Sequence, residues 1–250
     1  MITAAVDQLY LQEGQDQAKA AVCVTLHNYE RYLPGCLASV AAQTLPTLDL
    51  VVLDDCSEDA SCGLARAWLE AHGHRFNRVE LLRTRQNAGP VAAHNTAAMA
   101  AHSEYMLLLD ADNELLPRAL EDLLAALEDS GADFAFGLLE RFGGRQAIMH
   151  NVLWGKELLA RSNYWDTLAL MRRESFEKAG GHDDLGESAW GDYVMWCEVA
   201  MRGGWGVHVP QFVGRYRVHD KSVSAKVDED KIRRMHSKLN ARFPEIFGTE

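Results

Sequence analysis

The chain has 250 residues, 48% of them hydrophobic and 24% charged, and its formal net charge is −11 at pH 7. This composition suffices for one globular domain with a full core, whereas the acidic charge argues against a nucleic-acid-binding surface and a polybasic membrane anchor. We therefore expect no nucleic-acid partner.

Strand and helix patterns alternate through the first half of the chain. Residues 1–18 are polar and aperiodic, which predicts a polar leader that is either a frayed terminus or a short helix. Short apolar runs predict strands, and apolar residues every three or four positions predict helices. We expect strands at 20–26, 49–53, 79–83 and 105–109, and helices at 32–40, 64–72, 91–101 and 117–130. Such alternation is typical of a parallel sheet covered by helices on both faces.

The pattern changes after Gly137. Residues 138–225 are irregular and rich in Trp, Gly and His, which is more typical of a pocket wall than of a repeating layer. An apolar stripe predicts a helix over 193–201, and we expect Trp196 and Trp205 in the core. Residues 226–250 predict a C-terminal helical segment. We find no internal repeat, so we expect one domain over 19–225.

Targeting signals are not evident in the pattern. No apolar run approaches the roughly 20 residues that a membrane-spanning helix needs, and residues 1–17 lack the charged and apolar regions of a signal peptide. The five scattered cysteines form no CxxC pair, which fits reduced thiols better than a disulfide framework or a zinc site. We expect a cytoplasmic protein without a transmembrane segment, and peripheral association with the inner face of the membrane stays open.

Three predicted strands end in polar residues. The polar residues are His27 and Asn28 after the strand at 20–26, Asp54 and Asp55 after the strand at 49–53, and Asp110 and Asp112 after the strand at 105–109. Open α/β sheets bind ligands at the carboxyl ends of their strands, and carboxylates spaced like Asp110 and Asp112 suit a hard cation such as Mg²⁺ or Mn²⁺. The alternative for this pair is a solvated turn in which Asn113 caps the next helix.

Several motifs resemble those of the family 2 glycosyltransferases, whose fold is of the GT-A type. They occupy residues 25–33, 39–44, 51–57, 86–95, 105–112, 191–193 and 216–222, so that the match extends from about residue 22 to about residue 225. The resemblance implies an α/β fold, with one Rossmann-like, mostly parallel sheet flanked by helices. It also implies a nucleotide-sugar-binding half over 19–137 and an acceptor and catalytic half over 138–225.

The resemblance implies a metal-dependent inverting glycosyltransferase. Such an enzyme moves a sugar from a nucleotide-diphosphate donor, here a UDP-sugar, to a hydroxyl group of a glycan or lipid-linked acceptor, often in cell-surface polysaccharide synthesis. One alternative is a catalytically inactive GT-A-like module that binds nucleotide or glycan within a larger assembly. Another is a sugar-nucleotide pyrophosphorylase, which would need a Gly-rich segment with Arg and Lys where this chain has His27, Asn28 and Tyr29.

By the same resemblance, two residues hold the divalent cation, Mn²⁺ or Mg²⁺. Asp112 coordinates it directly, and His219 completes its shell or contacts the diphosphate, although a structural role for His219 stays open. Asp110 supports the cation or meets the ribose. The cation would then act as a Lewis acid on the leaving group.

The nucleotide site would contain five further polar residues. Asp55 would accept the uracil imide N–H, its alternative being helix capping. His27 takes the place of a base-stacking aromatic residue, and Asn28 and Asn87 lie in neighbouring motifs. His94 stands where many members carry Arg, whose permanent charge and two-pronged geometry a neutral imidazole lacks. An ordinary surface His is the alternative there, with Arg83 or Arg85 compensating.

Asp192 is the candidate catalytic base, which would take the proton from the acceptor hydroxyl. The family usually has Glu-Asp at this point, whereas this chain has Gly191-Asp192. Asp192 could instead cap the following helix, and the two roles are compatible because a helix N-terminus stabilises a carboxylate. Trp190 and Glu187 are the acceptor-site candidates.

Overall fold

The structure is a computed structural model that describes residues 1–187, 190–220, 222 and 228–248. Its strands are β1 (Val6–Gln12), β2 (Ala20–Leu26), β3 (Asp49–Asp54), β4 (Val79–Thr84), β5 (Tyr105–Asp110), β6 (Glu114–Leu115), β7 (Phe134–Phe142), β8 (Ala147–Met149), β9 (Leu170–Arg172) and β10 (Gly206–Arg217). Its α-helices are α1 (Leu33–Ala41), α2 (Ser61–His72), α3 (Gly89–Ala100), α4 (Ala119–Ser130), α5 (Lys156–Leu159), α6 (Arg173–Ala179), α7 (Gly191–Met201), α8 (Glu229–Arg242) and α9 (Pro244–Phe247). None of the described helices is long and apolar enough to cross a bilayer.

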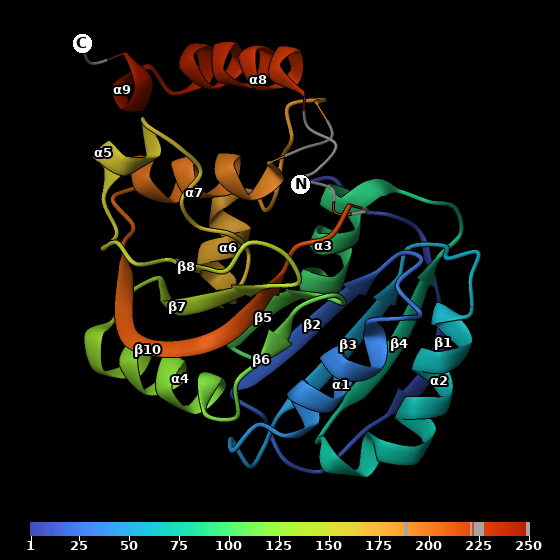
Figure 1. The fold of residues 1–250 in the computed structure, drawn as a ribbon. Coiled ribbons are helices and arrows are strands. Elements are labelled where there is room, and N and C mark those ends of the chain that lie inside the picture. Colours follow the sequence, from blue (N-terminus) through green and yellow to red (C-terminus); the bar gives the residue numbers. More distant parts are fainter. Residues whose placement is uncertain (188–189, 221, 223–227, 249–250) are drawn as a thin grey trace.

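These strands form one twisted sheet with helices on both faces (Figure 1). Its order is β1-β4-β3-β2-β5-β9-β7-β10-β6, and β8 pairs with β7. Strands β4, β3, β2 and β5 are parallel, which confirms the α/β fold expected from the alternating pattern. The remaining neighbours along the sheet are antiparallel, except for β7 and β10.

Strand β2 shows why the central strands are continuous apolar runs. Successive side chains of a strand point to opposite faces of a sheet. Val22 and Val24 pack in one core with α1, α2 and α4, whereas Ala21 and Cys23 pack in a second core with α3, α6 and α7. All seven residues of β2 are therefore buried, and their hydrophobic burial anchors both layers.

The N-terminal residues depart from the expectation. Residues 6–12 form β1, which pairs antiparallel with β4 at the edge of the sheet, so the prediction of a frayed terminus or leader helix is wrong. The register of this pair shifts between Gln8 and Tyr10. An edge strand is only partly buried, and a register shift breaks the alternation of polar and apolar residues. Because of partial burial and the register shift, the hydrophobic pattern of residues 6–12 does not indicate a strand.

Asn95 of α3 holds the segment that precedes β1. Its side chain is fully buried, and its amide donates hydrogen bonds of 2.9 Å to the carbonyls of Ile2 and His182. Its carbonyl oxygen accepts a 2.8 Å hydrogen bond from the His182 amide. One side chain thus joins the N-terminal segment, α3 and the stretch before α7.

The sheet continues into the C-terminal half, which we expected to be irregular. Strand β9 has three residues, too few to show an alternating pattern. Strand β10 has twelve residues, but its pairing with β7 shifts register between Val209 and Phe212 and again before Gly214. Short length and these shifts explain why the pattern does not reveal either strand.

The tryptophans divide differently from the expectation. Trp196 is 1% exposed and belongs to the second core, as expected. Trp205 is 44% exposed, so its assignment to the core is wrong. It lies between α7 and β10, where its backbone amide donates to the Asp133 carboxylate. All five cysteines are free, and Cys23, Cys36 and Cys197 are buried.

The hydrogen bonds of Asn95 lead to a stability prediction. Asn95→Ala should lower the free energy of unfolding by about 2–4 kcal/mol, because a buried backbone group left without its partner costs about 1–3 kcal/mol. Urea denaturation followed by circular dichroism measures the change. Asn240→Ala, the same substitution at an exposed position of α8, should stay within about 0.5 kcal/mol of wild type. Equal midpoints for the two variants would contradict the structural role of Asn95.

Candidate active site

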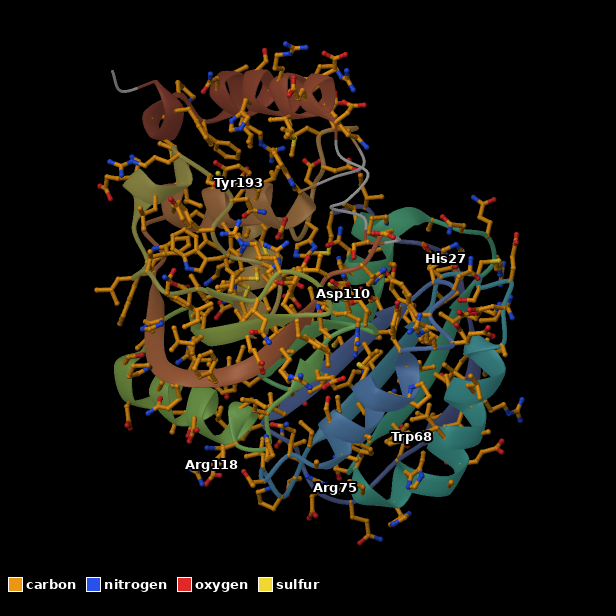
Figure 2. The ribbon with its side chains drawn as sticks, in the orientation of Figure 1. His27, Trp68, Arg75, Asp110, Arg118 and Tyr193 are labelled. Carbon is orange, nitrogen blue, oxygen red and sulfur yellow. The ribbon has the colours of Figure 1, made fainter. Side chains whose placement is uncertain are left out.

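A cavity of about 840 Å³ lies at the carboxyl ends of the parallel strands. Residues that follow or end β2, β3 and β5 line its floor, namely His27, Asn28, Asp55, Asp110 and Asp112. The walls come from α3, the loop 161–167, the first residues of α7 and one side chain of α8. Figure 2 shows Asp110 and His27 at the ends of these strands, with Tyr193 nearer the top of the view. The expected convergence of polar strand ends is thus observed.

The turn after β5 is buried rather than solvated. Asp112 and Asn113 are 7% and 3% exposed, and helix α4 begins only at Ala119, so Asn113 is not its cap. The Asn113 side chain instead accepts a 2.9 Å hydrogen bond from the backbone amide of Arg217. The Arg217 guanidinium donates a 2.9 Å hydrogen bond to the Asp112 carbonyl. Strand β10 therefore holds the turn that carries Asp112.

Asp112 lies beside His219, with 2.8 Å between Oδ2 and Nε2. Burial and the neighbouring Asp110 raise the pKa of Asp112 to about 6, against the opposing effect of His219. Within the described residues no three His, Cys, Asp or Glu side chains form a cluster that holds an ion by itself. The carboxylate of Asp112 and the imidazole of His219 are nevertheless possible ligands for Mn²⁺ or Mg²⁺, provided that substrate phosphates supply the remaining ligands. The residues present therefore fit a cation that binds together with the donor.

His94 of α3 is paired with Asp110 rather than lying on the surface. Its Nε2 is 2.8 Å from Asp110 Oδ1, and its side chain is 10% exposed. Burial acts to lower the pKa of His94, but the adjacent Asp110 outweighs it and the pKa lies above its ordinary value. Conversely, burial acts to raise the pKa of Asp110, and His94 outweighs it, so that this pKa is lowered. The alternative of an ordinary surface His is wrong.

The carboxylate of Asp55 organises the loop before α3. Its Oδ1 accepts 2.8 Å hydrogen bonds from the Thr84 hydroxyl and the Ala88 amide, and its Oδ2 accepts a 2.9 Å bond from the Gly89 amide. These contacts satisfy the N-terminus of α3, as the capping alternative implied. Asp55 also lines the cavity. The geometry is compatible with both roles, and contact with a base stays a prediction.

His27, Asn28 and Asn87 form a hydrogen-bonded group at the rim. His27 Nδ1 lies 2.8 Å from the carbonyl of Asp55, and the side-chain amides of Asn28 and Asn87 each lie 3.1 Å from Nε2. Asn28 adopts a left-handed backbone conformation, with φ of 58°, and its Oδ1 accepts a 2.8 Å bond from the Glu58 amide. These contacts hold the imidazole at the edge of the cavity.

Asp192 lies in the first turn of α7 and lines the cavity. Its Oδ1 accepts hydrogen bonds of 3.1 Å from the Asn163 side chain and 2.9 Å from the Tyr193 amide. Burial raises the pKa of Asp192 to about 6, although these two hydrogen bonds act to lower it. The capping residue of α7 is Trp190, so capping does not by itself account for Asp192. A carboxylate with this pKa can accept a proton near neutral pH.

Gly191 departs from the expected Glu because there is no space for a side chain. A Cβ at this position would lie 2.6 Å from Cγ2 of Val91 and 3.3 Å from Cβ of His182. Contacts this short require both neighbours to move. The close packing of α7 against α3 therefore excludes an acid here, and it leaves Asp192 in place.

The two acceptor-site candidates lie in different surroundings. Trp190 lines the cavity, and its ring contacts His236 of α8 edge-on, with 5.9 Å between ring centroids. Glu187 is 8% exposed and is not among the described residues that line the cavity. Its carboxylate pairs with Arg234 at 2.9 Å and Lys238 at 2.7 Å. These ion pairs occupy both oxygens, so Glu187 fastens its loop to α8 instead of facing an acceptor.

Among the cavity-lining residues that sequence reasoning missed are Asn163, Asp166, His182 and His236. Burial raises the pKa of Asp166 to about 7, and the charges of Asp192, Asp110 and Asp112 act in the same direction. A lone acid directly between Trp165 and the apolar run that begins at Leu168 was the available signal for Asp166. The other three have no local pattern, because their positions depend on tertiary contacts.

A family model matches residues 21–180, and its description is glycosyl transferase family 2. The chain belongs to this family. Its fold is that of the GT-A type, as the resemblance implied. Glycosyltransferase GlyA of Streptococcus pneumoniae is 30% identical over 132 residues, which cover 53% of this chain and 18% of the relative. Poly(ribitol-phosphate) beta-glucosyltransferase of Bacillus spizizenii is 29% identical over 129 residues, which cover 51% of this chain and 20% of the relative. The chain thus spans about a fifth of the length of these two curated relatives.

Two solved structures of similar fold contain nucleotide sugars. Residues 1–349 of TarS from S. aureus, crystallised with UDP-GlcNAc, have a similar fold. The match covers 92% of the present chain and 70% of the TarS chain at 16% identity, with a TM-score of 0.72. The mannosyltransferase PcManGT from Pyrobaculum calidifontis, in complex with GDP-Man and Mn²⁺, matches 92% of this chain and 66% of that chain at 20% identity, with a TM-score of 0.67. At these identities the likeness concerns the fold.

The packing around Gly191 predicts that the acid usual in the family is not tolerated. Gly191→Glu should lower the free energy of unfolding by about 1–3 kcal/mol, because excess volume in a packed region forces its neighbours to shift. Gly63→Glu is the matched control, since a Cβ at this exposed position of α2 meets nothing within 4 Å. The control should be neutral or slightly stabilising. A Gly191→Glu variant that melts at the wild-type temperature would contradict the clash.

Proposed function

We propose that this chain is an inverting glycosyltransferase that uses a UDP-sugar, a divalent cation and a hydroxyl acceptor. One observation carries the proposal: the carboxylates of Asp110 and Asp112 line the same cavity as the carboxylate of Asp192, whose pKa is raised to about 6. A cation-binding pair and a base on opposite elements are the groups that such a transfer requires. Membership of glycosyl transferase family 2 supports the proposal.

The donor is a UDP-sugar in this proposal. The structures of TarS with UDP and with UDP-GlcNAc support uridine, whereas the GDP-Man complex of PcManGT makes guanosine the alternative. Asp55 and His27 would read the base, and Asn28 and Asn87 would position it. His94 and Asp110 would contact the ribose or diphosphate between the base and the cation.

Asp112 and His219 would hold Mn²⁺ or Mg²⁺ together with the diphosphate of the donor. When bound, the cation offsets the charge that develops on the departing nucleotide. Asp110 contributes a second carboxylate to the same edge, and Arg217 fixes the turn that carries both acids. The Mn²⁺ in the PcManGT complex supports a divalent cation.

Asp192 would accept the proton from the acceptor hydroxyl as its oxygen attacks the anomeric carbon. The bond from that carbon to the diphosphate breaks, and its electron pair leaves with UDP. The Asn163 amide and the Tyr193 amide hold Asp192 Oδ1, so the carboxylate is oriented before the substrates bind. Attack from the side opposite to the leaving group inverts the configuration.

The acceptor is a glycan or a lipid-linked sugar, and the pathway is cell-surface polysaccharide synthesis. The name of the Bacillus spizizenii relative, a poly(ribitol-phosphate) beta-glucosyltransferase, supports this acceptor class. The free cysteines support the expected cytoplasmic location. The division into a donor half over 19–137, an acceptor half over 138–225 and a C-terminal segment is part of the same proposal.

Donor binding should depend on a divalent cation. UDP at 100 times its dissociation constant should stabilise the protein by about 2.7 kcal/mol when Mn²⁺ is present, and much less in EDTA. Asp112→Asn should lose the cation-dependent part, whereas Asp129→Asn on the exposed end of α4 should keep it. Thermal denaturation measures both. Equal stabilisation by UDP in Mn²⁺ and in EDTA would refute the cation role, and stronger stabilisation by GDP would refute the uridine assignment.

Asp192→Asn should separate donor binding from turnover. The amide cannot accept a proton, so UDP release from the donor should fall by about 10²–10⁴-fold, while UDP affinity stays near wild type. For wild type, kcat/KM should decrease tenfold per pH unit below about 6, because protonation of Asp192 removes the base. Near wild-type turnover of Asp192→Asn would mean that Asp192 is not the base. Tight UDP binding without any turnover of wild type would favour an inactive binding module.

A further inference from the structure

The loop 161–167 forms the wall of the cavity next to Asp192. It runs between α5 and β9, and most of its residues line the cavity. The Asn163 amide donates a 3.1 Å hydrogen bond to Asp192 Oδ1, which ties the loop to the first turn of α7. A ligand that contacts the second carboxylate oxygen of Asp192, Oδ2, would therefore also contact this loop.

Two oxygen atoms on this wall lack a donor. Asp192 Oδ1 accepts from Asn163 and Tyr193, whereas no hydrogen bond within the described part of the chain engages Oδ2. The side-chain oxygen Oδ1 of Asn163 is buried and likewise has no hydrogen-bond partner among the described residues. A buried acceptor without a donor is costly, which applies to Asn163 Oδ1, whereas Oδ2 of Asp192 keeps access to the cavity and can accept a hydrogen bond from a ligand there.

Asp166 adds a third such oxygen. Its Oδ1 accepts a 2.8 Å hydrogen bond from the Leu168 amide, and Oδ2 has no hydrogen-bond partner among the residues that the structure describes. The nearest imidazole nitrogen, Nε2 of His150, is 3.7 Å from Oδ1 and already accepts the Asp166 amide. Burial lowers the pKa of His150 to about 4, so it is neutral near pH 7 and offers Asp166 no charge. The Asp166 side chain is 19% exposed, and it lines the cavity.

The charge around this wall favours a neutral ligand. Asp110 and Asp112 lie across the same cavity, and Arg161 is the single Lys or Arg among the described residues that line it. A phosphate or carboxylate beside Asp166 and Asp192 would face like charges at short range. Hydroxyl groups donate hydrogen bonds without adding negative charge.

We propose that Asn163 and Asp166 form, together with Asp192, an acceptor subsite that binds a neutral polyol or sugar through its hydroxyl groups. Asp192 meets the reacting hydroxyl, Asp166 binds a neighbouring hydroxyl, and Asn163 positions Asp192 through its side-chain amide. The inference rests on the glycosyltransferase function proposed above. It adds Asp166 as a recognition residue, Asn163 as a positioning residue and a chemical class of acceptor.

The test measures UDP release from the UDP-sugar that stabilises the protein most, with Mn²⁺ present. Release is compared in water alone and with added ribitol, glycerol or methyl β-glucoside, and with ethanolamine or glycerol 3-phosphate as a cationic and an anionic probe. A neutral polyol should stimulate release by wild type. Asp166→Asn should raise the KM of that polyol about tenfold, the effect of losing one hydrogen bond, while UDP affinity stays near wild type.

Three variants serve as controls. Asp166→Ser keeps a side-chain oxygen that can accept from the Leu168 amide, so it should fold and show the same rise in KM. Asp129→Asn, on the exposed end of α4, should behave as wild type. Asp192→Asn should lose release in water as well as with polyol, which distinguishes a base from a recognition residue.

The outcomes separate this inference from the function beneath it. A wild-type KM for polyol in both Asp166 variants would overturn it, as would stimulation by ethanolamine or glycerol 3-phosphate alone, or by none of the probes. If wild type neither binds nor releases UDP, the proposed function fails and the subsite falls with it. Normal UDP binding and release with an unaffected Asp166 variant would refute the subsite alone.

Discussion

The site depends on one electrostatic constraint, the gathering of carboxyl groups around a single cavity. Asp110, Asp112, Asp166 and Asp192 all line it, and their neighbours are mainly imidazoles and neutral amides. Burial and mutual repulsion raise the pKa values of Asp112, Asp166 and Asp192, whereas His94 lowers that of Asp110. Such a cluster is unfavourable in isolation. A bound cation, together with ligand hydroxyl groups that donate hydrogen bonds, would reduce the repulsion between these carboxylates.

The fold supplies the rigidity that this cluster needs. The parallel strands bring three polar ends to one edge, and both faces of the sheet are covered by packed helices. The remaining carboxylates come from the opposite side, on the loop 161–167 and the start of α7. Helix α8 then holds the neighbouring loop through the pairs of Glu187 with Arg234 and Lys238. Carboxylates thus line the cavity from both sides, whereas the acidic Glu187 next to it is paired with two basic residues.

The sequence predicts the residues at the strand ends of the cavity better than those on the opposite wall. Apolar strands precede three of these residues, His27, Asp55 and Asp110, so the local hydrophobic pattern predicts their positions. All three line one cavity in the structure. Asp166 and Asn163 lie in a loop between short elements, where no period exists to be detected. The ion pairs of Glu187 could not be foreseen for a related reason: its partners lie on α8, about 50 residues away in sequence. Strand β1 was missed because an edge strand buries only part of its surface.

The contacts of β10 with the turn after β5 also bear on how the chain folds. Arg217 and His219 meet Asp112 and Asn113 across separations of 104 to 107 residues. Loop closure over such distances is paid before the contacts form, which slows folding and makes long-range pairings late events. The central strands can pair earlier through shorter connections. A nascent chain that has not yet completed β10 therefore lacks the hydrogen bonds that order the turn carrying Asp112, even when most of its other strands can already pair.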